Sequence, residues 1–201
     1  MNLPSTTTDK VRWTMDGDGA WVCFRVPTPA VRSLWRISRD LGTSMYEVSR
    51  ITRACIAHRI LGHAGRCKQL HGHNYRFTLT LRSPHLDTLE MLMDFGDIKQ
   101  FWDKWIDENW DHRTILNSRD PLLKYFERAQ KNSPALTEAL GEAILSYDWN
   151  PTAEKMAKFL AENVREHLWR TSKLPTIYEI IVRVEETDGN TASFCMTVQG
   201  E

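Results

Sequence analysis

The stretch RCKQLHGHNYRFTLTL, residues 66–81, joins a cysteine and two histidines to a strand-like pattern. From His73 onward apolar and polar residues alternate, and the apolar side chains are those of Tyr75, Phe77, Leu79 and Leu81. Because successive side chains on a strand point to opposite faces, this alternation predicts a half-buried strand. The same rule places His71 and His73 on one face, with Gly72 expected to leave room between them, so that both imidazoles can reach one ion.

Periodic segments on both sides of this strand predict further elements. Residues Tyr46–Arg59 are interpreted as an earlier strand, although their alternation is poor. Asp94 is placed to cap a helix that runs to about Trp110, with an apolar stripe formed by Ile98, Phe101, Trp102, Trp105 and Ile106. A second helix is predicted from Asn150–Pro151, with an apolar stripe formed by Met156, Phe159, Leu160, Val164 and Leu168.

The C-terminal segments Ile177–Glu186 and Ala192–Gln199 flank the turn signal Asp188-Gly189-Asn190 and predict a β-hairpin. The resulting order β-β-α-α-β-β predicts an α+β fold, with a four-stranded antiparallel sheet and two helices on one face. We expect residues 45–201 to form this domain, with residues 118–149 as a partly helical insertion. Residues 1–44 are an N-terminal extension of unknown role, in which Trp21–Val26 is the one segment that we predict as a strand.

The composition argues against several classes of partner. Lys+Arg and Asp+Glu each total 26, and this zero net charge gives no broad attraction to nucleic acid or to an anionic membrane. The beginning of the sequence lacks a signal-peptide profile, and no apolar run approaches the roughly 20 residues that span a bilayer. The four cysteines, Cys23, Cys55, Cys67 and Cys195, form no CxxC pair and fit a reducing compartment. We therefore expect a soluble, cytoplasmic protein.

A metal site needs a third donor besides His71 and His73, because their spacing alone would also suit two solvated or hydrogen-bonded histidines. His58, in CIAHRI at the end of the earlier strand, is the best candidate, since an antiparallel neighbour can bring it opposite them. Three neutral imidazoles suit zinc and leave a fourth position open. Cys67 then has two alternative roles: a fourth ligand that closes a structural site, or a thiolate beside the ion that acts as base or nucleophile.

Two further features contribute carboxylates. Asp111–His112 follows the first predicted helix, and a carboxylate beside a histidine can hold the imidazole for proton transfer, although such a pair can also act as a helix cap. Glu186 shares the apolar face of its strand with Val182 and Val184. Such a carboxylate needs a partner, for example the N–H groups of a ligand, unless it lies past the buried part of the strand and is solvated.

Taken together, these segments resemble the family of 6-pyruvoyltetrahydropterin synthase and 6-carboxytetrahydropterin synthase enzymes, which share the tunnelling fold. The resemblance runs from about residue 46 to residue 199. It rests on six motifs in family order: CIAHRI, CKQLHGHNY, LMDFGDIK, DHRTILN, NPTAEKMA and VEET. Any one of these motifs is weak, whereas six in order are highly specific.

The resemblance implies a role for each candidate residue. The zinc ligands it implies are His58, His71 and His73. The catalytic groups it implies are the thiol of Cys67 and a second proton-transfer element formed by Asp111 and His112. A pterin ring would be held by Glu186, with help from the region of Thr152.

The spacing C-x3-H-x-H, from Cys67 to His73, is similar to that of the carboxy-tetrahydropterin branch, because the animal pyruvoyl enzymes place more residues between the cysteine and the first histidine. This implies conversion of 7,8-dihydroneopterin triphosphate to 6-carboxytetrahydropterin, with release of acetaldehyde and triphosphate, in 7-deazaguanine (queuosine) biosynthesis. One alternative is 6-pyruvoyltetrahydropterin synthase, which eliminates triphosphate without releasing acetaldehyde. Another is a non-catalytic zinc-stabilised module for pterin binding or assembly, in which Cys67 completes a closed site.

The resemblance also implies a homo-oligomer, a trimer or hexamer, in which subunit sheets join into a barrel and the sites lie between subunits. The open edges of a four-stranded sheet make such closure physically reasonable. Cys67 and His112 of one site need not then come from one chain. The sequence departs from compact family members before residue 46 and in a longer stretch between DHRTILN and NPTAE, but neither departure removes a matched residue.

Overall fold

The structure is a computed structural model that describes residues 11–15, 21–25, 44–173 and 176–198. The chain divides into two units, residues 1–44 with residue 201 and residues 45–200, and each is described by itself. In the first unit, β1 (Val11–Met15) pairs antiparallel with β2 (Trp21–Arg25). The strand predicted over Trp21–Val26 is thus present to Arg25, and Val26 lies outside the described residues. The sequence analysis missed β1, because an alternation of five residues is too short to stand out.

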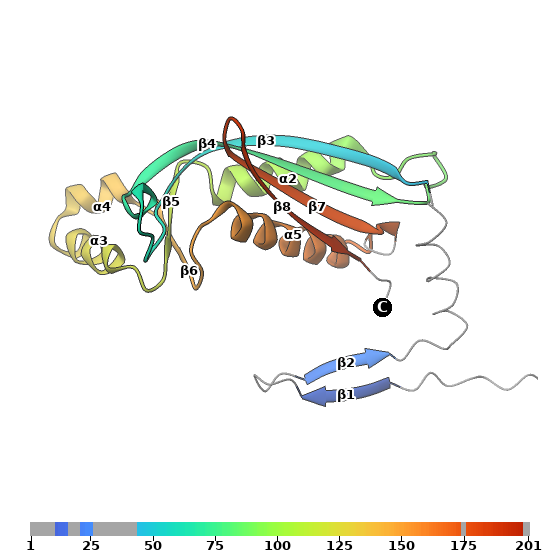
Figure 1. Cartoon of the computed structure of the whole chain (residues 1–201), viewed down its shortest axis with the longest axis horizontal. Coiled ribbons are helices and arrows are strands. Elements are labelled where there is room, and N and C mark those ends of the chain that lie inside the picture. Colours follow the sequence, from blue (N-terminus) through green and yellow to red (C-terminus); the bar gives the residue numbers. More distant parts are fainter. Residues whose placement is uncertain (1–10, 16–20, 26–43, 174–175, 199–201) are drawn as a thin grey trace, which may run out of the picture. The chain divides into compact units, whose positions relative to one another are not determined.

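The second unit is built on a six-stranded mixed sheet in the order β6-β5-β3-β4-β7-β8 (Figure 1). Its strands are β3 (Tyr46–His58), β4 (His71–Ser83), β5 (Arg113–Asn117), β6 (Ile144–Tyr147), β7 (Glu179–Thr187) and β8 (Asn190–Thr197). Strands β3, β4, β7 and β8 pair antiparallel, whereas β5 pairs parallel to β3 and β6 pairs parallel to β5. The predicted α+β class is confirmed, but the prediction of four strands, all antiparallel, is wrong. The additional strands have only five and four residues, too few for a periodic signal.

Two long helices, α2 (Phe95–Asn109) and α5 (Ala153–Arg170), lie on the same side of the sheet (Figure 1). Asp94 caps α2 as predicted, since its carboxylate accepts a hydrogen bond from the amide of Gly96 at 2.6 Å. The segment predicted as an insertion contains α3 (Pro121–Asn132), α4 (Pro134–Leu140) and β6. A short 3-10 helix, η1 (Arg66–Lys68), lies between β3 and β4. No helix in the described part of the chain is long and apolar enough to cross a membrane.

The second long helix begins later than the sequence suggested. Its N-cap is Thr152 and its first residue is Ala153, rather than Asn150–Pro151. The reason is that Asn150 is held in a different interaction: its side chain accepts from the amide of Leu61 at 3.1 Å and donates to the carbonyl of the same residue at 2.9 Å. These bonds fix the segment before α5 against the loop that follows β3.

The core lies between the sheet and these two helices. The alternation read from β4 is confirmed, because the four apolar side chains on one face are fully buried: Tyr75, Phe77, Leu79 and Leu81. They pack with the buried faces of β7, α2 and α5, including Val182, Trp102 and Leu160. Burying one such side chain contributes roughly 1.5–3 kcal/mol, so this continuous cluster fixes which face of β4 points toward the helices.

The C-terminal hairpin is confirmed with slightly different bounds. Residues Thr187 and Asn190 pair across a two-residue turn, Asp188–Gly189, and Gly189 has a φ of 88°, which glycine adopts without strain. Strand β8 therefore begins at Asn190, two residues before the predicted start at Ala192. The pairing of β7 with β8 is irregular between Glu185 and Thr187, which places Glu186 at a bulge-like position.

Candidate metal centre

Three histidines meet at one end of β3 and β4. His58, the last residue of β3, pairs directly with His71, the first residue of β4, and Ile56 pairs with His73. The ring centroids are 4.7 Å apart for His58 and His71, 4.9 Å for His71 and His73, and 5.3 Å for His58 and His73. One ring nitrogen from each lies within 4.8 Å of the others, which is close enough for the three to share one metal ion. The structure therefore brings together the three histidines that the sequence proposed as ligands.

Strand register and parity explain this convergence. Residues His58, His71 and His73 lie on the face of the sheet that continues into the core, because they alternate with the exposed residues Cys55 and Asn74. Gly72 has a different role from the one expected, since its position faces the other side of the sheet. A Cβ there would lie 3.3 Å from the carbonyl oxygen of Ile56, so glycine allows β3 and β4 to approach closely rather than making room between the imidazoles.

Backbone carbonyls fix the orientation of two of the imidazoles. His58 Nδ1 lies 2.7 Å from the carbonyl oxygen of Pro151, and His71 Nδ1 lies 2.7 Å from that of Gln69. A carbonyl oxygen only accepts, so each Nδ1 carries the hydrogen and each Nε2 presents a lone pair. His73 Nε2 is buried and has no hydrogen-bond partner among the described residues. Three imidazole nitrogens within 4.8 Å of one another fit a divalent ion such as zinc.

Electrostatics favours the neutral form of His58 that a metal requires. Burial lowers the pKa of His58 below its ordinary value, and the neighbouring histidines act in the same direction. The hydrogen bond to the Pro151 carbonyl and the charge of Glu186 oppose this shift without reversing it. His58 therefore stays unprotonated near neutral pH, and its Nε2 lone pair is available to a cation.

Glu186 lies beside the histidines rather than in open solvent. Its Oε1 atom is 3.0 Å from the hydroxyl of Tyr75, 3.2 Å from His58 Nε2 and 3.8 Å from His73 Nε2. The partner required for a carboxylate at the end of an apolar face is thus the phenol of Tyr75. The hydroxyl of Thr152 accepts from the amide of Lys155 at 3.3 Å and caps α5. The part of the Thr152 region in holding a pterin stays a prediction.

Cys67 lies in η1 and is partly buried. Its carbonyl oxygen accepts from the amide of Ile60 at 2.7 Å, which closes the loop between β3 and β4. In the part of the chain that the structure describes, the group of ligand atoms within 4.8 Å of one another consists of the three histidines and does not include Cys67. The role of the thiol stays a prediction.

Asp111 and His112 contact each other just before β5. Asp111 Oδ2 is 2.8 Å from His112 Nδ1, and Asp111 Oδ1 accepts from the amide of Cys55 at 2.7 Å. The carboxylate therefore orients the imidazole, as expected for a proton-transfer pair. His112 is 80% exposed. It lines a shallow hollow whose lining also includes Cys55, Asn74 and His73. The side chains of Cys55 and Asn74 alternate with those of the histidines along β3 and β4, so they point to the other face of the sheet.

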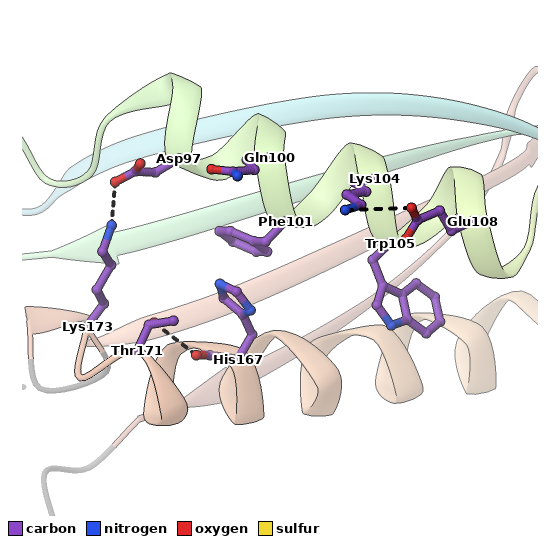
Figure 2. Close-up of a pocket in the computed structure, with 9 residues that line it drawn as sticks. All are labelled: Asp97, Gln100, Phe101, Lys104, Trp105, Glu108, His167, Thr171 and Lys173. Atoms are coloured by element: carbon purple, nitrogen blue, oxygen red, sulfur yellow. Dashed lines mark hydrogen bonds and ion pairs between the residues drawn. The ribbon is translucent and has the colours of Figure 1, made fainter.

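A separate groove between α2 and α5 shares no residue with the histidine cluster (Figure 2). The imidazole of His167 stacks on Phe101 with 4.4 Å between ring centroids, and burial together with Lys173 lowers the pKa of His167. The charged groups on the rim pair with one another, Lys173 with Asp97 and Lys104 with Glu108, as Figure 2 shows. The floor of the groove is thus aromatic and uncharged, and the charges on its rim are paired with one another. We therefore place the candidate site at the histidines.

The sequence analysis missed Tyr75 and the carbonyls of Gln69 and Pro151 as parts of the site. Tyr75 was assigned only to the core face of its strand. The signal that could have revealed it is a tyrosine at a fully buried position two residues after His73, because a buried hydroxyl requires a polar partner. The carbonyls carry no such signal, since any residue type provides one.

Comparison with known proteins places the chain in a family. Residues 47–196 match the family model of 6-pyruvoyl tetrahydropterin synthase. The chain belongs to this family. The resemblance inferred from the six motifs is thereby confirmed, and the histidine centre lies in a member of a family of tetrahydropterin synthases.

Named relatives and solved structures agree with this placement. The chain is 36% identical over 116 residues to the 6-carboxy-5,6,7,8-tetrahydropterin synthase of Rickettsia bellii, covering 58% of this chain and 78% of the relative. It is 38% identical over 107 residues to that of Rickettsia felis, covering 53% and 71%. The fold matches an uncharacterized protein of Wolinella succinogenes with a TM-score of 0.63 at 24% identity, covering 75% of this chain and 98% of that one. It matches 6-pyruvoyltetrahydropterin synthase of Plasmodium vivax with a TM-score of 0.59 at 18% identity, covering 77% and 99%.

Proposed function

We propose that this protein is a zinc-dependent 6-carboxy-5,6,7,8-tetrahydropterin synthase. It converts 7,8-dihydroneopterin triphosphate and water to 6-carboxytetrahydropterin, acetaldehyde and triphosphate, in the cytoplasm, as a step of 7-deazaguanine (queuosine) biosynthesis. The observation that carries the proposal is the convergence of three histidine nitrogens within 4.8 Å beside the carboxylate of Glu186. The names of the relatives that are 36–38% identical support the carboxy branch.

The metal in this proposal is zinc, held by His58, His71 and His73. Neutral imidazoles are donors that zinc prefers, and three of them leave a fourth position open. Two of the three, His58 and His71, have Nδ1 bonded to a backbone carbonyl. When bound, zinc supplies a Lewis acid next to the hydroxyl-bearing side chain of the substrate. The protein's share of this task is to hold the three nitrogens in place.

Two groups of the protein move protons in the proposed reaction. Cys67, as a thiolate, takes a proton from the substrate side chain. A thiol can act in this way because it lies outside the cluster of ligand atoms. His112, held through Nδ1 by Asp111, exchanges a second proton at Nε2. Together they allow loss of triphosphate and cleavage of the carbon–carbon bond that releases acetaldehyde.

The position of His112 supports a site shared between subunits. His112 is exposed and lines a hollow on the face of the sheet opposite to the histidine centre, so the His112 that serves one centre comes from a neighbouring copy. In the described part of the chain, β5 pairs only with residues 56–58 of β3, so residues 46–55 have no strand partner on that side. β8 forms the opposite edge of the sheet. Two such edges permit pairing between copies and closure into a barrel, as a trimer or a hexamer.

Glu186 binds the pterin ring in this proposal. A carboxylate accepts hydrogen bonds only, and a pterin presents N–H groups that match it. The location of Oε1, 3.2 Å from His58 Nε2, would place the ring next to the metal and the reacting side chain. Thr152 contributes by capping α5. The residue before it, Pro151, accepts the hydrogen bond that orients His58.

Residues 45–201 form the catalytic domain in this proposal, and residues 118–149 are an insertion in it. The N-terminal extension, residues 1–44, has no role assigned in this proposal. The chain covers more than two thirds of the length of each Rickettsia relative, so the residues needed for the reaction are expected within the matched region.

The test is to incubate zinc-loaded protein with 7,8-dihydroneopterin triphosphate and to measure acetaldehyde and free triphosphate together. Acetaldehyde and triphosphate formed in equal amounts would support the proposal. Triphosphate without acetaldehyde would replace it with 6-pyruvoyltetrahydropterin synthase. If assembled, zinc-loaded protein releases neither, the non-catalytic zinc-stabilised pterin-binding or assembly module becomes the better description. Cys67→Ala, loaded with the same zinc content, is the matched control.

A further inference from the structure

A buried ion pair joins the loop after β3 to the start of the insertion. Arg59, the residue after His58, places its Nε atom 3.1 Å from Oδ2 of Asp120. The side chain of Asp120 is fully buried, and that of Arg59 is 19% exposed. Neither atom has a hydrogen-bond partner among the described residues, so the contact is an attraction between charges and does not depend on the alignment of the N–H. Because a buried charge without a partner is strongly destabilising, each of the two side chains holds the other in place.

The Asp120 carboxylate is itself fixed by the turn that ends β5. The carbonyl of Asn117, the last residue of β5, accepts from the amide of Asp120 at 2.8 Å, and its side-chain oxygen accepts from the amide of Arg119 at 2.9 Å. The second carboxylate oxygen of Asp120, Oδ1, accepts from the amide of Leu122 at 2.9 Å and caps α3. Since β5 pairs with the last three residues of β3, this turn presents the carboxylate at the metal-centre end of the sheet.

The loop that begins at Arg59 is the one that carries Cys67. The next residue, Ile60, donates its amide hydrogen to the carbonyl of Cys67 at 2.7 Å, so the start of the loop is joined directly to η1. Leu61 is held from outside the loop by two hydrogen bonds to the side chain of Asn150, at 3.1 and 2.9 Å. The place of η1 therefore depends on where these first three residues of the loop lie, and the ion pair fixes the first of them.

We propose that Asp120 is a positioning residue for Cys67. Through Arg59 it fixes the start of the loop, and the bond between Ile60 and Cys67 passes this constraint to η1. The insertion thereby supports the site without supplying a group that reacts. This inference rests on the proposed function for the role of the Cys67 thiol.

Substitution can separate the ion pair from the helix cap. Asp120→Asn keeps an oxygen that caps α3, since Asn and Asp are equally favourable at a helix N-cap, and it removes the charge that attracts Arg59. Arg59→Met keeps an apolar stem and removes the opposite charge. The double variant, Arg59→Met with Asp120→Asn, leaves no unpaired charge buried, so it folds even where a single variant does not.

The experiment measures the rate at which iodoacetamide alkylates Cys67 in folded, zinc-loaded protein, relative to the exposed Cys55 of the same chain. Mass spectrometry of the two peptides gives this ratio without any substrate. We expect the ratio to rise about tenfold in each single variant, because the released loop opens to solvent more often. The double variant should match the single variants, since both substitutions remove the same contact. At unchanged zinc content, kcat should fall about tenfold, because the thiol is displaced from its reacting position.

Asp103→Asn is the matched control. It removes a carboxylate that pairs with Arg50, a β3 residue far along the strand from the Cys67 loop. We expect this variant to leave the ratio of Cys67 to Cys55 alkylation as it is in the wild type. An equal rise in Asp103→Asn would overturn the inference, because the effect would then be a general loss of stability.

The outcomes separate this inference from the proposed function. An unchanged or lower ratio in the double variant would overturn the inference and leave the proposed function standing. A raised ratio with unchanged kcat would also overturn it, because the ion pair would then hold the loop without positioning the thiol. If zinc-loaded wild type shows no turnover, the proposed function fails, whereas the ratio, measured without substrate, still shows whether the ion pair holds the loop.

Discussion

The two faces of the sheet at the His58–His71 end differ in how firmly their histidine side chains are held. On the face toward the helices, the imidazoles of His58 and His71 are oriented by backbone carbonyls at 2.7 Å. On the other face, His112 is held by one neighbouring carboxylate and is 80% exposed. In the proposed function, this difference means that one chain prepares the metal centre by itself, whereas His112 is presented to a group outside the chain.

This difference follows from the physical needs of the two functions. A metal centre requires several donors at fixed positions and a dry environment, which a strand register and a core can provide. In the proposed function, the Asp111–His112 pair must reach the substrate, and His112 is accessible on the exposed side of the sheet. A neighbouring copy that covers this side would complete the site.

The largest expected effect comes from a ligand of the metal centre. His71→Ala removes one of three nitrogens, so we expect it to lose both zinc and turnover. Cys67→Ala should retain zinc and lose turnover by about 10²–10⁴-fold, the usual contribution of a positioned proton-transfer group. Metal analysis and steady-state kinetics on the two variants check this. A Cys67→Ala variant with the wild-type rate would contradict the role of the thiol.

The second prediction tests whether the two faces belong to different subunits in one site. Cys67→Ala and His112→Ala should each be nearly inactive. When the two variants are unfolded, mixed in equal amounts and refolded together, about a quarter of the sites should contain both intact groups if they come from different chains. Recovery of activity near that fraction supports a shared site. No recovery in correctly assembled mixed protein would place Cys67 and His112 of one site in the same chain.

A smaller effect should appear in the pH dependence of stability of the zinc-free protein. Burial lowers the pKa of His58 in the folded state, while the unfolded chain titrates near the ordinary value of about 6.5. As the pH falls below that value, the unfolded state binds more protons, so the free energy of unfolding decreases, by at most about 1.4 kcal/mol per pH unit for one group. Urea unfolding at a series of pH values measures the slope.

His58→Gln is the variant for this measurement, and it should flatten the slope below pH 6.5. His167 contributes a second slope in the wild type and in the variant, because burial lowers its pKa too, so the difference between the two proteins isolates His58. Equal slopes in the two proteins would mean that His58 is not held neutral by the fold.

The sequence was informative where a pattern repeats along a strand or a helix. The alternation from His73 to Leu81 predicted β4 and its buried face, and the spacing of apolar residues after Asp94 predicted α2. Strands β5 and β6 were missed, because four or five residues carry too little pattern and their pairing depends on distant parts of the chain. The start of α5 was misplaced because Asn150 bonds to the loop after β3.

The candidate site divides in the same way. The three histidines were found because histidine has a distinctive chemistry and because strand parity predicts which residues share a face. The carbonyls that orient two of them, and the phenol of Tyr75 that joins them to Glu186, depend on how strands and loops meet in space. The face of the sheet on which His112 lies could not be read from the sequence, since it depends on how β5 pairs with β3.

The most direct test of a metal centre built from three histidines is X-ray absorption at the zinc edge of the loaded, assembled protein. The account predicts three imidazole nitrogens at about 2.0–2.1 Å, a fourth ligand with an oxygen donor such as water, and no sulfur. A sulfur scatterer at about 2.3 Å would mean that Cys67 closes the site, which would contradict an open centre with a free catalytic thiol.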